Sequence, residues 1–158
     1  MSDATVTVER LLRAVLDGFG LDGELSIEED PERGVVAVID GSGLEPLVGR
    51  DGEVIDAIQY LAHQAIMRTG DGERRRVLVD VAGYRARRRV QLERLAEHAA
   101  TEALRHQEEI ELDAMTPHDR RIVHLALSER ADIVTRSEGE EPHRRIVVLP
   151  AALAADDV

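Results

Sequence analysis

The 158-residue sequence predicts an α+β protein built from two small domains. In the first half, helical spacing and short apolar runs alternate in the order helix, strand, strand, helix, strand. In the second half, a long helical pattern precedes a short capped helix and a β-hairpin. We therefore expect a first domain over residues 1–82, a second over residues 83–150, and a disordered tail over residues 151–158.

The composition limits the function classes. The absence of cysteine excludes disulfides, thiolate metal sites and a cysteine nucleophile. One Phe, two Tyr and no Trp leave little for stacking bases on aromatic rings, so an RRM-like mode is not expected. No apolar run approaches the length of a membrane span, and the amino terminus lacks the features of a signal peptide. We expect a cytoplasmic protein without membrane insertion.

The charge is divided unevenly along the chain. The net charge is −12, which by itself opposes nucleic-acid binding. Residues 1–73 contain 5 Arg and 16 acidic residues, whereas residues 74–158 contain 15 Arg and 16 acidic residues. The second half is thus nearly neutral and holds most of the cationic groups available for phosphate.

The elements of the first half follow from periodicity and turn residues. A helix with apolar residues at helical spacing ends at Gly18 and Gly20, two strands flank a turn that contains Pro31, and a loop of small polar residues follows. A third strand comes after the central helix. The expected ranges are 6–19 for the helix, 24–28 and 35–39 for the hairpin strands, 40–43 for the loop and 76–81 for the third strand.

The central stretch is the glycine-bracketed turn Gly49-Arg50-Asp51-Gly52, which opens an amphipathic helix ending near Gly70. Glycine lets the backbone turn sharply, and the free amides at the start of the helix then favour an anion. A plain turn is the competing interpretation. We expect this exposed turn to tolerate aspartate at Gly49 and Gly52 without loss of the fold. The apolar stripe expected to face the sheet is Val54, Ile55, Ile58, Leu61, Ala62, Ala65 and Ile66.

A long helix is predicted from Tyr84 to about Gln107, and its first turns are arginine-rich. A solvated helix face and an RNA-facing patch are both open for these arginines. Cations at a helix start oppose the helix dipole, so the cluster has no purely local stabilising reason. The cluster consists of Arg85, Arg87, Arg88 and Arg89.

The second domain begins its short helix with Thr116 as the cap, Pro117 at the first position and Asp119 where a capping-box acid would lie. Strands are expected over residues 132–137 and 144–149. Four residues separate Arg120 from His124, so their side chains share one helix face.

Three kinds of donor are expected to meet near this helix start. Arg120 offers a guanidinium fork, His124 offers a ring N–H, and Arg144 or Arg145 is expected to reach in from the hairpin strand. These donors suit phosphate, and a phosphate contact carries no base information. For His124, a helix histidine bonded to a neighbouring backbone group is the competing interpretation.

The glycine-bracketed turn and its helix resemble the KH domain, whose GXXG loop clamps nucleic-acid backbone. The capped Arg-x-x-x-His helix with its hairpin resembles the domain named for that motif, which binds single-stranded nucleic acid. Together, over about Val6 to Leu149, the two resemble the bacterial Jag family, also called KhpB or EloR. The amino-terminal Jag domain of some members has no counterpart here, and Asp51 stands where a basic or small residue would favour phosphate.

The resemblance implies a KH-like (type II) α/β sandwich followed by a small α/β domain of the Arg-x-x-x-His type. It implies a single-stranded RNA-binding regulator, with single-stranded DNA as a further ligand, acting after transcription and linked to cell elongation and the cell envelope. It assigns RNA binding to Gly49, Arg50, Asp51, Gly52, Arg120, His124, Arg144 and Arg145. A small KH-domain protein is the implied partner, and a homodimer stays open.

The sequence does not predict an enzyme. Its acidic residues lack metal-ligand spacing, no nucleophile lies beside a base, and neither a P-loop nor a GXGXXG motif is present. No metal and no cofactor are expected. The competing function is a protein-interaction adaptor, in which the acidic first half docks on a basic partner and both nucleic-acid motifs are vestigial.

Overall fold

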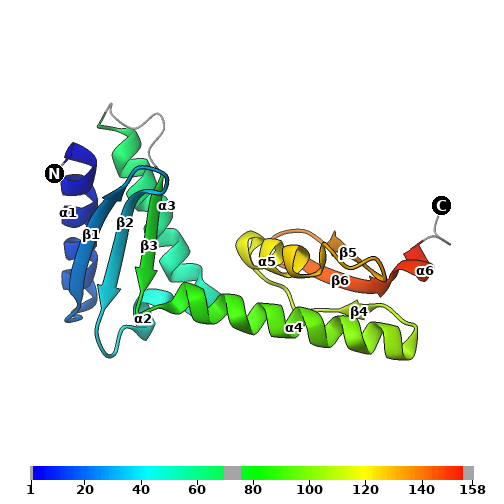
Figure 1. Ribbon diagram of the computed structural model, residues 1–158. Helices are drawn as coiled ribbons and strands as arrows, with labels where there is room; N and C mark the ends of the chain where they lie inside the picture. The colour runs from blue at the N-terminus through cyan, green and yellow to red at the C-terminus, as the bar shows by residue number, and fades with distance from the viewer. Residues whose placement is uncertain (1, 70–75, 155–158) are drawn as a thin grey trace. The chain divides into compact units, whose positions relative to one another are not determined.

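The computed structural model describes residues 2–69 and 76–154, divided between two compact units, residues 1–85 and 86–158. Each unit contains a three-stranded sheet with helices packed on it (Figure 1). The α+β fold class predicted from the sequence is therefore confirmed. The predicted helix end near Gly70 and the strand entry through Asp71-Gly72 lie outside the described residues.

The first unit follows the predicted element order. Helices α1 and α3 pack together and cover one face of the sheet β1-β2-β3. Strands β1 and β2 are antiparallel, with Ile27 opposite Ala37, and β2 and β3 are parallel, with Val35 opposite Val77. The elements are α1 (Asp3–Phe19), β1 (Glu24–Asp30), β2 (Gly34–Asp40), α2 (Glu45–Val48), the single 3₁₀ turn η1 (Arg50–Gly52), α3 (Glu53–Met67) and β3 (Val77–Val81).

The core of this unit is aliphatic. Alternate residues of β2 and β3 point toward the helices and are buried, which is the period expected of a half-covered sheet. On α3 the buried positions are Ile55, Ile58, Ala62 and Ile66. The predicted stripe is wrong at Leu61, which is 52% exposed because it lies to one side of this buried row.

The four-residue helix α2 was not predicted. It brings Leu44 and Leu47 into the core just before the glycine-bracketed turn. A helix this short has too few residues to show a period in the sequence, although Pro46 at its start is a typical helix-opening residue.

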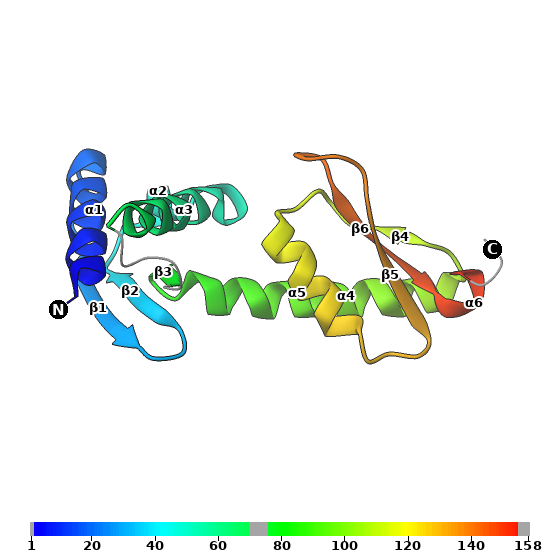
Figure 2. The same ribbon diagram turned by 90° about the horizontal axis from the view of Figure 1, so that it is seen from above.

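The second unit contains the sheet β4-β6-β5, in which every pair is antiparallel. Helices α4 and α5 share one apolar cluster with this sheet, and Figure 2 shows α5 crossing α4. The elements are α4 (Tyr84–His106, whose first two residues belong to the first unit), β4 (Ile110–Glu111), α5 (Pro117–Leu127), β5 (Ile133–Glu138), β6 (Arg145–Pro150) and α6 (Ala151–Ala154).

Four details of the second unit differ from the sequence prediction. The two-residue strand β4 was not predicted. The disordered tail predicted from residue 151 is wrong for Ala151–Ala154, which form α6. On α4, Val90 and Leu95 are exposed, because the buried face is instead made mainly by alanines next to Leu92.

Within the described residues, no helix combines the length and apolar character that crossing a membrane requires.

Candidate nucleic-acid interface

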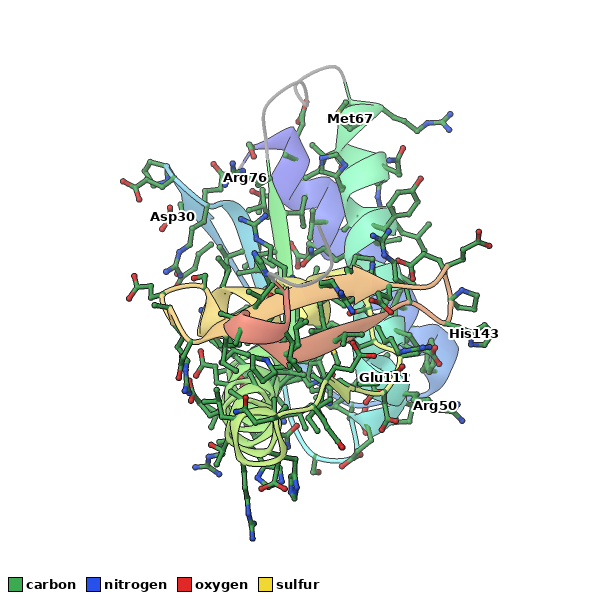
Figure 3. The ribbon with its side chains drawn as sticks, turned by 90° about the vertical axis from the view of Figure 1, so that its right-hand side faces the viewer. Asp30, Arg50, Met67, Arg76, Glu111 and His143 are labelled. Atoms are coloured by element: carbon green, nitrogen blue, oxygen red, sulfur yellow. The ribbon has the colours of Figure 1, made fainter. Side chains whose placement is uncertain are left out.

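The glycine-bracketed turn joins α2 directly to α3. Gly49 has φ +73° and Gly52 has φ +86°, and Asp51 between them also has a positive φ of 51°. Aspartate is one of the few residues that adopt this region readily. The side chains of Arg50 and Asp51 are exposed, and Figure 3 shows Arg50 at the periphery of the ribbon. The turn therefore offers an exposed cation beside the first amides of α3.

Both glycines are required by close packing as well as by φ. A Cβ on Gly49 would lie 2.4 Å from Cγ2 of Val54, and a Cβ on Gly52 would lie 2.8 Å from Cε1 of Tyr84. Gly52 is buried although its neighbours are exposed. The expectation that both glycines tolerate aspartate is therefore wrong, and RNA binding at this turn has to be tested at Arg50 or Asp51.

Two of the four arginines near the start of α4 are fixed by long-range contacts. Arg85 donates to the Val79 carbonyl at 2.8 Å, to Gln59 at 3.0 Å and to the Asp56 carboxylate at 3.1 Å. Arg88 donates twice to one carboxylate oxygen of Asp119, at 2.7 and 3.0 Å. These residues fasten α4 within their own units, which is the stabilising reason that local sequence did not supply.

The amino end of α5 is capped as predicted in one respect and not in another. The Thr116 hydroxyl accepts from the backbone N–H of Asp119, and Pro117 takes the first helical position. The Asp119 side chain is buried and receives Arg88, so the interpretation of Asp119 as a capping-box acid is wrong. The buried pair instead joins α4 to the first turn of α5.

A surface groove of about 520 Å³ lies between α5 and the hairpin of β5 and β6. It brings Arg120, His124 and Arg144 together. Arg145 is not among them, because its side chain pairs with Glu111 of β4 at 2.9 Å. The groove is lined by Pro117, Arg120, Arg121, His124, Thr135, Ser137, Arg144 and Ile146.

Arg120 is buried and already has partners. Its Nη1 donates to the Met115 carbonyl at 2.7 Å and to Oε2 of Glu141 at 3.3 Å, and its Nη2 forms an ion pair with Oε1 of Glu141. The hydrogen bond from Arg120 lowers the pKa of the Glu141 carboxyl below its ordinary value. The fork predicted to meet phosphate thus holds a carboxylate of the same chain.

The two other predicted donors are oriented by hydroxyls. Nδ1 of His124 lies 2.6 Å from the Thr135 hydroxyl, and Nε of Arg144 donates to the Ser137 hydroxyl at 2.8 Å. The partner of His124 is therefore a side chain on β5 and not a backbone group. When the Thr135 hydroxyl donates to Nδ1, the other ring nitrogen carries the proton and is a donor.

Sequence reasoning missed Arg121, Thr135, Ser137 and Glu141. The two hydroxyls had a usable signal, because residues two apart on a strand point to one face. Arg121 forms no ion pair within residues 2–69 and 76–154. Glu141 had no signal, since 21 residues separate it from Arg120. No cluster of acidic or histidine residues in the described ranges has an arrangement that could hold a metal ion.

Residues 90–150, which include the whole groove, match the family of domains named for the Arg-x-x-x-His motif. Over 87% of its length the chain is 33% identical to the RNA-binding protein KhpB of Clostridium symbiosum and 34% identical to that of Lactiplantibacillus plantarum. The corresponding identity to KhpB of Bacillus subtilis is 29%. The chain belongs to the KhpB (Jag/EloR) family.

The chain spans only part of each of these KhpB relatives. The matched region covers 62% of the Clostridium symbiosum protein, 42% of the Lactiplantibacillus plantarum protein and 66% of the Bacillus subtilis protein. The match includes most of both structural units, because it extends over 137 to 139 residues.

Proposed function

We propose that this member of the KhpB family binds single-stranded RNA, with the groove between α5 and the β5–β6 hairpin as its principal phosphate site. The observation that carries the proposal is the convergence of Arg120, Arg121, His124 and Arg144 on one groove beside the capped start of α5. The relatives named as RNA-binding proteins support the choice of ligand.

Each group in the groove has a distinct role in this proposal. Arg121 is exposed and supplies a guanidinium that no carboxylate in the described residues occupies. His124 donates from the ring nitrogen opposite Thr135, and Arg144 adds a second cation beside Ser137. The amino end of α5 contributes a partial positive charge. All four contacts favour phosphate and none reads a base, so binding is expected to depend little on sequence.

The glycine-bracketed turn is proposed as a second RNA contact. Its exposed Arg50 and the free amides at the start of α3 suit a backbone phosphate, in the manner of a KH loop. Asp51 opposes phosphate by its charge. We expect this turn to bind mainly through its amides, because Arg50 is its single basic residue.

The test is the affinity of the full chain for a fluorescently labelled oligouridine, measured by anisotropy over a range of salt. Arg121→Ala should weaken binding roughly three- to tenfold and reduce the slope of log affinity against log salt by about 0.7, as for one lost phosphate contact. Arg94→Ala is the matched control, since Arg94 is an exposed arginine of α4 that does not line the groove. Equal affinities for the wild type, Arg121→Ala and Arg94→Ala would overturn the assignment of this groove.

The wider biological role extends the same proposal. From the resemblance to the family, we infer post-transcriptional control linked to cell elongation and the cell envelope, without catalysis. A small KH-domain protein is the proposed partner. Competition between RNA and single-stranded DNA of the same sequence would show whether the ribose hydroxyl contributes to binding.

One observation favours a second function. Residues 1–73 hold 16 acidic residues against 5 Arg, which suits a basic protein partner. In that adaptor function RNA would not compete for the partner, and the RNA affinity of the wild type would be no stronger than that of a variant lacking the groove cations. The salt titration with Arg121→Ala therefore distinguishes the two functions.

A further inference from the structure

The Arg120 site is built as an anion site and is occupied by the chain itself. A guanidinium binds the two oxygens of a carboxylate in nearly the same way as it binds two oxygens of a phosphate. Glu141 approaches with both oxygens, one to Nη1 and one to Nη2 of Arg120. The pair therefore has the geometry that a backbone phosphate would adopt at the same fork.

The two partners differ sharply in how firmly they are held. The Arg120 side chain is 9% exposed and is anchored by the Met115 carbonyl, whereas the Glu141 side chain is 51% exposed. Glu141 lies between β5 and β6, where residues 139–144 are all exposed. The arginine is thus fixed in the domain, and the carboxylate lies at the surface, where little packing has to be broken for it to leave.

Departure of the carboxylate would expose cations to the groove. Arg120 lines that groove, and so does Arg144, whose positive charge also acts on Glu141. An incoming phosphate would replace one anion by another, so the buried guanidinium would not be left unpaired at any stage after exchange.

We infer that Glu141 is an internal competitor for the Arg120 site, so that phosphate of RNA enters this site only by displacing the Glu141 carboxylate. This inference rests on the proposed function for its natural ligand, but the exchange itself can be tested with inorganic phosphate. It makes Glu141 a residue that sets the strength of RNA binding without contacting the RNA.

The test compares the full-length wild type with Glu141→Gln and Glu140→Gln. Glutamine keeps the shape and a neutral acceptor but removes the charge. Glu140 is the matched control, because it is exposed, adjacent and of the same charge, and its side chain forms no ion pair in the described ranges. Unfolding by urea is measured in sodium chloride and in inorganic phosphate at equal ionic strength, and the dissociation constant for labelled oligouridine is measured separately.

Phosphate should raise the urea midpoint of Glu141→Gln more than that of the wild type or of Glu140→Gln. Glu141→Gln should also tighten oligouridine binding by about two- to fivefold, which is the extent to which a half-exposed ion pair would oppose it. Glu140→Gln should give a smaller gain, because it removes long-range repulsion alone. If Glu141→Gln lowers the urea midpoint and phosphate does not restore it, the carboxylate is purely structural and the inference is wrong.

The exchange at Arg120 and the RNA-binding proposal fail under different outcomes. If phosphate selectively stabilises Glu141→Gln but none of the three proteins binds oligouridine, the exchange stands and the RNA-binding proposal fails. If the wild type binds oligouridine and Glu141→Gln binds no more tightly than Glu140→Gln, the RNA-binding proposal stands and the competitor role of Glu141 is overturned.

Discussion

At the scale of single residues, the glycine-bracketed turn is set by what lies beneath it. Gly52 is buried against the ring of Tyr84, and its φ of +86° strains any other residue. The sequence shows two glycines two residues apart, which indicates a sharp turn. It does not show that Tyr84, 32 positions later, closes the space above Gly52.

Gly52→Ala should therefore be more destabilising than a positive φ alone explains. We expect it to lower the free energy of unfolding by more than about 2 kcal/mol, as the sum of backbone strain and the clash with Tyr84. Gly43→Ala is the control, because Gly43 has φ +71° but open space around its Cβ, and it should cost about 1 kcal/mol. Urea unfolding followed by circular dichroism gives both values. Equal losses at the two positions would mean that the Tyr84 contact carries no cost.

At the scale of elements, the regular pieces were predictable and their connections were not. Thr116 and Pro117 marked the start of α5, and alternation marked the hairpin of β5 and β6, because both signals lie within a few residues. The short elements α2 and β4 left no period. The partners of Arg85, Arg88 and Arg120 lie 21 to 31 residues away, so no local pattern could show that these arginines are already engaged.

The pair of Arg88 with Asp119 gives the element-scale prediction. Asp119 is 4% exposed, so Arg88→Met would leave a buried carboxylate without its cation. We expect a loss on the order of 3 kcal/mol in the free energy of unfolding, because the desolvated charge is no longer compensated. Arg89→Met, at an exposed neighbouring arginine, should change the same quantity by less than about 0.5 kcal/mol. Similar small effects for both variants, measured by urea unfolding, would contradict a joining role for the Arg88 pair.

At the scale of the whole molecule, stability should fall in acid for reasons present in both units. Backbone hydrogen bonds from Arg33 and Glu32 lower the pKa of Asp30, the side chain of Arg130 lowers the pKa of Asp132, and that of Arg120 lowers the pKa of Glu141. A lowered pKa in the folded state stabilises the fold above the ordinary value, 3.8 for Asp and 4.5 for Glu. That contribution is lost as the pH falls through the folded pKa.

We therefore expect the urea midpoint to be steady above about pH 5 and to decrease from there toward pH 3. Asp132→Asn should lower the midpoint at pH 7 and reduce its dependence on pH, because the charge that Arg130 stabilises is gone. Asp40→Asn, at an exposed aspartate that ends β2, is the control and should leave the acid dependence as in the wild type. An unchanged acid dependence in Asp132→Asn would exclude its pair with Arg130 as a contributor.

The central claim is that backbone phosphate of RNA binds in the groove of α5, β5 and β6, with a second contact at the glycine-bracketed turn. The most direct measurement is the amide NMR spectrum of the full chain titrated with a short oligouridine. We predict that the saturating shifts concentrate in the first turn of α5, in the groove-facing residues of β5 and β6, and in residues 49–54. Shifts confined to other surfaces, or no shifts at concentrations where anisotropy reports binding, would contradict it.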